Sequence, residues 1–365
     1  MAGRIVVFGA TGYTGRLTAE ALVARGLRPC LAARDPVKLG KLADELGGEL
    51  ETQMADVDRP ASVASLVEEG DVLIATVGPF VRWGDAAAQA AIAKRAHYID
   101  STGEPPFIRK VFEDYGPQAK AAGIGMLTSF GYDWVPGNLA AGLALRDAGP
   151  SAVRVDTGYF TTGPARPSGG TSASLAGVAA EPSFAFRDGA LKSVRSADRH
   201  RTFAVRGRER PAVTVGSSEH FALPRVSESL REVNSYLGWF GPMSRAVQAS
   251  SLLGAGLFRI PGSRKLYGRA VERYVKGSTG GPDAEQRAKT GSYVVAEAFD
   301  ASGNRLAEVQ VTGVDAYTFT GGILAWGAER AAVGGLRANG ALGPVDGFGL
   351  DELEAGCREV GLSRA

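Results

Sequence analysis

A glycine-rich loop near the N-terminus constrains the fold of this chain more than any other feature. The loop, Gly9-Ala10-Thr11-Gly12-Tyr13-Thr14-Gly15, follows the apolar run Ile5–Phe8 and opens the helix-period segment Tyr13–Arg25. In such a loop the first glycine permits a tight turn, the second lets the backbone approach a pyrophosphate, and the third lets the helix pack closely on the strand. The free N–H groups of the first helical turn then face the phosphates. The pattern therefore predicts a dinucleotide-binding unit.

The rest of the first 150 residues continues the alternation of short apolar runs with amphipathic or alanine-rich helices. Asp35, directly before Pro36, is typical of a helix N-cap, and Asp58-Arg59-Pro60 offers a similar start. Alternating strands and helices favour a parallel sheet. We therefore expect an α/β protein whose residues 1–150 form a Rossmann domain, a doubly wound parallel sheet. The predicted strands are Ile5–Phe8, Pro29–Ala33, Leu50–Met54, Val72–Thr76, His97–Asp100 and Gly125–Ser129.

After Gly149 the pattern changes to longer β-rich stretches. Ser292–Asp300 and Arg305–Val314 predict a hairpin, while Arg225–Val275 is interpreted as mostly helical. Tyr317–Ala338 is interpreted as a late helix that packs back on the first domain. We therefore expect an α+β substrate and dimerisation domain at residues 151–316 and a C-terminal helical segment at residues 317–365.

Charge and cysteine content narrow the class of partner. The 41 Lys and Arg residues against 39 Asp and Glu give a net charge of +2, which favours a small-molecule partner and no nucleic acid. Cys30 and Cys357 lie far apart without a CxxC motif, and Cys30 falls in an apolar run that predicts a buried, inert thiol. We expect no metal site, because the three histidines His97, His200 and His220 also lack ligand spacing.

No signal peptide and no uninterrupted apolar run of about 18 residues occurs in the sequence. We therefore expect a cytoplasmic protein, a homodimer, without a transmembrane segment. The apolar stretch Tyr236–Ile260 leaves contact with a membrane surface open.

The end of the second predicted strand favours NADP(H) as the cofactor. An NAD enzyme places an acidic side chain there to hold the ribose 2′-hydroxyl, whereas this chain has Ala33 and then Arg34, whose guanidinium suits a 2′-phosphate. Asp35 is an alternative ribose ligand, although its position also suits a helix cap. Asp56 is either an adenine contact or a turn residue. The expected cofactor residues are Gly9, Thr11, Gly12, Tyr13, Thr14, Gly15, Arg34, Asp56, and Gly78, Pro79 and Phe80 in the turn after the fourth strand.

Four segments together resemble the saccharopine dehydrogenase-like oxidoreductases, in particular the branch of the trans-acting enoyl reductases. They are Gly9–Arg16, Val77–Phe80, His97–Glu104 and Phe130–Pro136. The resemblance implies a Rossmann domain, a nicotinamide cofactor and hydride transfer. It leaves the substrate open, because members act on imine or enoyl groups. The chain also has Tyr132-Asp133-Trp134-Val135-Pro136-Gly137-Asn138 where the enoyl reductases have Phe-Asp-Ser-Val-Pro-Ser-Asp, which predicts a different specificity.

Three residues are candidates for proton transfer to a reduced substrate. None of the ten tyrosines has a lysine four residues later, which disfavours the short-chain dehydrogenase mechanism. Tyr132 and Asp133 follow the sixth strand at its carboxyl end, and Asp133 suits an acid if burial raises its pKa. Its alternative role is the N-cap of a helix beginning near Pro136. Glu104 is a second carboxylate at the same edge, with an exposed loop charge as the alternative.

These inferences predict an NADPH-dependent reductase of a C=C or C=N bond in a small-molecule or lipid-linked substrate. The alternatives are a non-catalytic NADP(H)-binding sensor or scaffold, and a protein that acts at a lipid surface. A deep pocket beside the nicotinamide position with a buried carboxylate or tyrosine would favour the enzyme.

Overall fold

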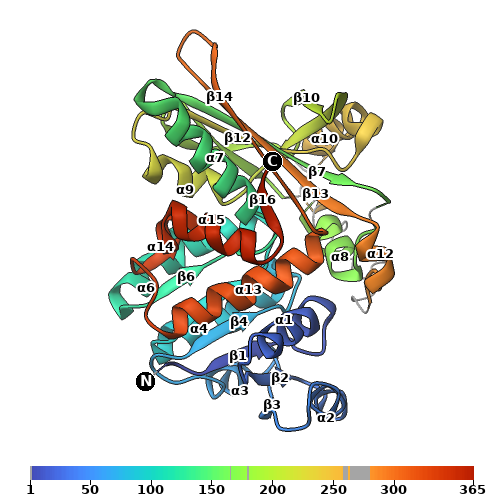
Figure 1. Cartoon of the computed structure of the whole chain (residues 1–365), viewed down its shortest axis with the longest axis vertical. Helices are drawn as coiled ribbons and strands as arrows, with labels where there is room; N and C mark the ends of the chain where they lie inside the picture. The colour runs from blue at the N-terminus through green and yellow to red at the C-terminus, as the bar shows by residue number, and fades with distance from the viewer. Residues whose placement is uncertain (1, 165, 179–180, 258–261, 264–279) are drawn as a thin grey trace.

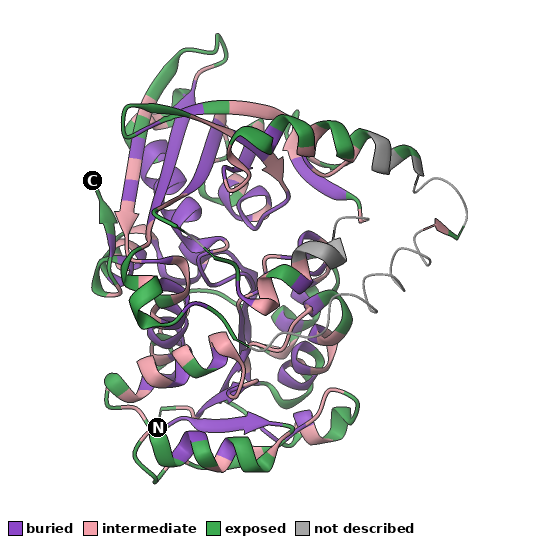
Figure 2. Cartoon of the chain, turned by 90° about the vertical axis from the view of Figure 1, so that its right-hand side faces the viewer, coloured by how far each residue is buried: buried purple, intermediate pink, exposed green. Residues whose placement is uncertain are grey.

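Two β-sheets with their helices build the chain, one towards each end of its long axis (Figure 1). The computed structural model describes residues 2–164, 166–178, 181–257, 262–263 and 280–365. Buried residues run through the strands of both sheets (Figure 2). The predicted class, a Rossmann sheet joined to a second α+β part, is confirmed, whereas the boundaries at residues 150 and 316 stay predictions.

The first sheet is parallel throughout, in the order β15-β6-β5-β4-β1-β2-β3. The strand order reverses between β1 and β4, which is the switch point where ligands bind in such sheets. All six predicted strands form. Their bounds are β1 Ile5–Phe8, β2 Cys30–Ala33, β3 Thr52–Met54, β4 Val72–Ala75, β5 His97–Asp100 and β6 Gly125–Leu127.

The seventh strand of this sheet, β15, comes from the C-terminal part of the chain. It is Gly340–Leu342 and pairs with β6. Sequence reasoning missed it because three residues carry no measurable periodicity.

Helices α2 and α3 begin at the prolines that the sequence predicts, Pro36 and Pro60, but of the two only α2 has a side-chain cap. The Asp35 carboxylate accepts hydrogen bonds from the N–H groups of Val37 and Lys38, each at 3.1 Å, so its role as an N-cap is confirmed. The late helix α13 packs against α1 and over β4 and β5. The helix bounds are α1 Tyr13–Ala24, α2 Pro36–Glu45, α3 Pro60–Ala64, α4 Phe80–Lys94, α5 Pro105–Lys110, α6 Gly116–Ala122, α7 Val135–Ala148 and α13 Ala316–Ala332.

The second sheet is mixed, in the order β10-β11-β12-β7-β13-β14-β16, with β8 pairing to β12 and β9 pairing to β8. The predicted hairpin forms as antiparallel β13 and β14, and α7 packs on these strands and on β7. The strand bounds are β7 Arg154–Thr162, β8 Ser183–Arg187, β9 Ala190–Val194, β10 His200–Val205, β11 Arg208–Val215, β12 Glu232–Leu237, β13 Gly291–Phe299, β14 Arg305–Gly313 and β16 Leu362–Arg364. The helices are α8 Gly169–Val178, α9 Glu219–Val226, α10 Ser244–Leu257, α12 Ala284–Ala288, α14 Pro344–Phe348 and α15 Leu350–Glu359.

Two sequence interpretations of this half were wrong. The stretch Arg225–Val275 is not mostly helical at its start, because β12 lies inside the sheet between β11 and β7. Asn234 of β12 is polar but buried, and its side-chain amide donates a hydrogen bond to Asp156. A pattern of apolar and polar residues along the sequence does not show this partner. Residues 258–261 and 264–275 of that stretch lie outside the described residues. The helix predicted to reach Ala338 ends at Ala332, just before two glycines.

Candidate cofactor and substrate site

A cavity of about 1040 Å³ lies at the carboxyl ends of the parallel strands and extends to the second sheet. The loops after β1, β2, β3, β4, β5 and β6 all line it, and so do residues of α8, β11, β12 and α10. Ligands of open α/β sheets bind outside the carboxyl ends of the strands. The cavity therefore suits a cofactor on the first sheet with a substrate beside it.

Gly9 and Gly15 of the glycine loop occupy positions where a side chain would not fit. Gly9 has a φ of +91°, and a Cβ on Gly15 would lie 2.2 Å from the Gly9 carbonyl oxygen, so any side chain there would push α1 off β1. Gly9, Thr11, Gly12, Tyr13 and Thr14 line the cavity, whereas Gly15 is a packing residue. No side chain caps α1 within the described residues. The first N–H groups of this helix are therefore free to bind a phosphate.

Two cations lie where a ribose 2′-phosphate is expected. Arg34 is exposed, lines the cavity and makes no hydrogen bond or ion pair with any described residue. Lys38, four residues later in α2, lines the same wall. Sequence reasoning missed Lys38, although its place in the first turn of the helix that follows Arg34 was a usable signal. One oxygen of Asp35 is occupied by the α2 cap, which disfavours Asp35 as the ribose ligand.

Asp56 lines the cavity beside β3 and also closes a turn. Its Oδ1 accepts a hydrogen bond of 3.0 Å from the N–H of Asp58. Asp56 therefore acts as a turn residue, and its Oδ2 remains available to contact an adenine.

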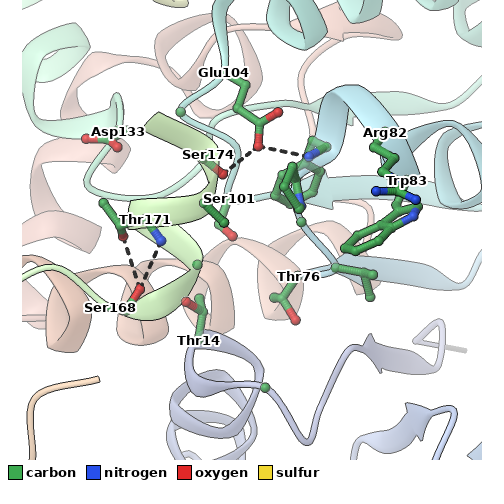
Figure 3. A pocket seen from close by; sticks show the side chains of 18 of the residues that line it. Thr14, Thr76, Arg82, Trp83, Ser101, Glu104, Asp133, Ser168, Thr171 and Ser174 are labelled. Carbon is green, nitrogen blue, oxygen red and sulfur yellow. Dashed lines mark hydrogen bonds between the residues drawn. The ribbon is translucent and has the colours of Figure 1, made fainter. Parts of the chain in front are cut away.

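Glu104 is buried and holds the start of α4. Its carboxylate accepts hydrogen bonds from the N–H groups of Phe80 at 2.8 Å and Val81 at 2.9 Å, and from the Ser174 hydroxyl at 2.6 Å (Figure 3). With a side chain 1% exposed, the alternative of an exposed loop charge was wrong. Both oxygens act as acceptors, so the geometry favours a positioning role for Glu104 over proton donation. Gly78, Pro79 and Phe80, which it supports, line the cavity.

Asp133 is a half-buried residue of the cavity whose carboxyl oxygen Oδ1 is buried. Helix α7 begins at Val135 with no side-chain cap, so the alternative role of Asp133 as its N-cap was wrong. Asp133 lines the cavity, and its Oδ1 is buried without a hydrogen-bond partner among the described residues. Burial raises the pKa of this carboxyl to about 7. A Cβ on Gly103 would lie 2.7 Å from Oδ2, so only glycine makes room for this side chain.

The Tyr132 side chain does not line the cavity. Its hydroxyl donates a hydrogen bond of 3.1 Å to the Phe160 carbonyl on β7, and Tyr132 is not among the described residues that line the cavity. Burial raises the pKa of its phenol above the ordinary range. The structure therefore brings Asp133 and Glu104 into one cavity and leaves Tyr132 outside it.

A second buried carboxyl, missed from the sequence, supports the segment that carries Asp133. Glu219 is 0% exposed, accepts a hydrogen bond of 2.6 Å from the Tyr159 hydroxyl, and has its pKa raised to about 7 by burial. The same hydroxyl accepts the N–H of Gly137 in the first turn of α7 at 2.9 Å. No local pattern marks Glu219, because tertiary packing alone brings α9 to α7.

The wall from the second sheet carries the apolar residues Val213, Val215, Leu237 and Trp239, and Trp134 from the loop after β6 also lines the cavity. Trp326, a further candidate for the pocket, instead packs in the core, 4.7 Å from the ring of Phe348 between centroids.

The environments of His97 and Cys30 indicate structural roles. His97 Nδ1 accepts the N–H of Gly125, and burial lowers the pKa of this imidazole. Cys30 is buried, as predicted, and burial raises the pKa of its thiol to about 11. The part of the chain that the structure describes holds no group of three His, Cys, Asp or Glu residues arranged to bind a metal ion. Within the same ranges, no helix combines the length and apolarity that crossing a bilayer requires.

Comparison with known proteins identifies the first half of the site. Residues 5–127 match the family model described as the saccharopine dehydrogenase NADP binding domain. The match shows a similarity to that domain over the Rossmann part of the chain. The match confirms the expected resemblance and the expectation that the Rossmann domain binds NADP(H).

Two curated relatives and one solved structure extend the comparison. A trans-acting enoyl reductase of Mycobacterium ulcerans is 34% identical over 140 residues, and the lipid droplet localized protein of Caenorhabditis elegans is 31% identical over 146 residues. Each alignment covers 37% of this chain and 34% of the relative, so the chain matches about a third of the length of these proteins. Apo saccharopine dehydrogenase (L-Glu forming) of Saccharomyces cerevisiae aligns over 100% of this chain and 99% of its own, with a TM-score of 0.61 and 12% identity. At that identity the likeness shows the fold.

Proposed function

We propose that this protein is an NADPH-dependent oxidoreductase that reduces a C=C or C=N bond of a small-molecule or lipid-linked substrate. The observation that carries the proposal is Asp133, whose buried Oδ1 has no hydrogen-bond partner among the described residues and which lines the same cavity as the cofactor loops. A carboxyl with a pKa of about 7 holds a proton near neutral pH and releases it readily, which a general acid must do.

The residues of the cavity fit NADP(H). The open N-terminus of α1 suits the pyrophosphate, and Arg34 with Lys38 suits the 2′-phosphate. When bound, the cofactor supplies the hydride. The chain orients the two partners, its apolar wall excludes water, and Asp133 donates the proton that completes the addition of two hydrogens to the double bond.

The apolar lining and the relatives support a lipid-linked substrate. Trp134, Leu237 and Trp239 offer a surface for an acyl chain. One relative is named a trans-acting enoyl reductase and another a lipid droplet localized protein, and both names agree with this class of substrate. The expected dimer and cytoplasmic location stay predictions, which sedimentation velocity and cell fractionation test.

The test is NADPH consumption against a panel of enoyl thioesters, imines and ketones. Asp133→Asn should lower kcat by about 10²- to 10⁴-fold, the usual contribution of a general acid, with an unchanged Kd for NADPH. Asp114→Asn, which changes an exposed carboxylate of the Rossmann domain, is the matched control and should retain full activity. If the wild-type protein binds NADPH tightly and reduces no member of the panel, the alternative of a non-catalytic sensor is favoured instead.

A further inference from the structure

Helix α8 forms one wall of the cavity, opposite the glycine loop. Ser168, Thr171 and Ser174 line the cavity together with Thr14 at the start of α1. Figure 3 shows α8 running from Ser168 up to Ser174, with Thr14 below it and Glu104 above. A dinucleotide in the glycine loop would therefore lie under α8.

The N-terminal end of α8 is tied to the glycine loop through Tyr317. The Tyr317 hydroxyl accepts the N–H of Ser168 at 2.6 Å and lies 3.0 Å from the hydroxyl of Thr171. The Tyr317 ring packs edge-on against the ring of Tyr13, with 5.1 Å between centroids and an interplanar angle of 81°. Tyr13 stands between the second and third glycines of the loop, so one contact joins α8 to the phosphate-binding backbone.

Tyr13 is itself fixed to the second half of the chain. Its hydroxyl donates a hydrogen bond of 2.5 Å to the Pro282 carbonyl and accepts one of 3.2 Å from Arg287. A Cβ on Gly281 would lie 2.6 Å from the Tyr13 ring, so this segment packs directly on the tyrosine. The Tyr13 side chain therefore cannot move without moving the segment that precedes α12.

The middle of α8 is tied to the loop after β4. The Ser174 hydroxyl donates a hydrogen bond of 2.6 Å to Glu104, and the same carboxylate holds the N–H groups of Phe80 and Val81. Phe80 lies in the turn expected to contact the cofactor. Both attachments of α8 therefore end on loops that bind NADP(H).

We propose that α8 closes over bound NADP(H), held by the bonds of the Tyr317 hydroxyl to Ser168 and Thr171 and by the Ser174–Glu104 hydrogen bond, so that release of the cofactor requires both attachments to open. Tyr13, Tyr317, Ser174 and Glu104 are positioning residues in this scheme. Because α8 lines the same cavity as the glycine loop, a bound cofactor contacts both and favours the closed arrangement. The inference rests on NADP(H) binding and is independent of the reduction proposed above.

The experiment measures the rate at which the full chain releases NADPH. Protein loaded with NADPH is mixed with excess NADP⁺ in a stopped-flow instrument, and the fluorescence of bound NADPH is followed. Ser174→Ala removes a hydrogen bond to a charged group and should raise the release rate by roughly tenfold or more. Tyr317→Phe removes neutral hydrogen bonds and should raise it by roughly two- to tenfold.

Ser172→Ala is the matched control on the same helix. The Ser172 hydroxyl is exposed and bonds only to the Ser168 carbonyl within α8, and Ser172 does not line the cavity among the described residues. Its release rate should equal that of the wild type. Equal rates in all four proteins, or an equal increase in all three variants, would overturn the proposal. If the protein binds NADPH normally but reduces no substrate, only the proposed reductase function is contradicted. The two proposals can therefore fail separately.

Discussion

Replacing Asp133 by asparagine should remove a specific part of the pH dependence of stability. The pKa of this carboxyl rises from its ordinary value of 3.8 to about 7 on folding, because the group is buried without a partner. Between these pH values the folded chain holds a proton that the unfolded chain has lost, so the free energy of unfolding must fall as pH rises. A difference of roughly three units corresponds to about 4 kcal/mol, since each unit is worth about 1.4 kcal/mol.

Urea unfolding of the wild type and Asp133→Asn, in steps from about pH 4 to about pH 8, measures this contribution. The stability of the variant relative to the wild type should increase by about 4 kcal/mol across the range. Asp100 is also a buried carboxyl with a raised pKa, and its contribution is common to both proteins. Glu219 also remains in both, but the Asp133 charge helps to raise its pKa, so the measured difference includes this coupling.

A constant difference between Asp133→Asn and the wild type would refute the reasoning. It would mean that Asp133 ionises in the folded chain as easily as in water. A carboxyl of that kind is deprotonated near neutral pH, so the proton donor would have to be sought elsewhere.

Three further substitutions test the site. Arg34→Ala should raise the Kd for NADPH by about 10- to 100-fold in a fluorescence titration and leave the Kd for NADH unchanged, and an equal loss for both cofactors contradicts a 2′-phosphate contact. Gly15→Ala places a Cβ 2.2 Å from the Gly9 carbonyl oxygen and should destabilise the chain by about 1–3 kcal/mol in thermal unfolding; an unchanged Tm would show that α1 can shift without loss. Tyr159→Phe removes the hydroxyl that donates to Glu219 and should lower the free energy of unfolding by about 1–3 kcal/mol. The loss should be largest above pH 7, where Glu219 ionises, and an equal loss at all pH values would exclude the carboxylate as its cause.

The parts of the fold that were predictable are those whose cause is local. The strands β1, β2 and β4 are short apolar runs between turns, and Asp35 caps α2 with its own neighbours. The strand β12 was missed because the buried Asn234 depends on a partner 78 residues away. Periodicity describes what a segment buries on average and does not identify single long-range hydrogen bonds.

As in the fold, the predictable parts of the candidate site are those with a local cause. The glycine loop and Arg34 follow from motif and position, and the family match supports the cofactor. The environments of Asp133 and Glu104 did not follow, because one depends on where α7 begins and the other on backbone N–H groups more than 20 residues earlier. Glu219 had no sequence signal at all, since only the packing of α9 against α7 brings it to Tyr159.

The pairing of β15 with β6 sets the order in which this protein can be completed on the ribosome. Residues 340–342 are synthesised more than 200 residues after β6, so the Rossmann sheet emerges with one unpaired edge. An open strand edge is a template for pairing with another chain. Chains that lack β15 should therefore leave the edge of β6 open to pairing with another chain until residues 340–342 have been added.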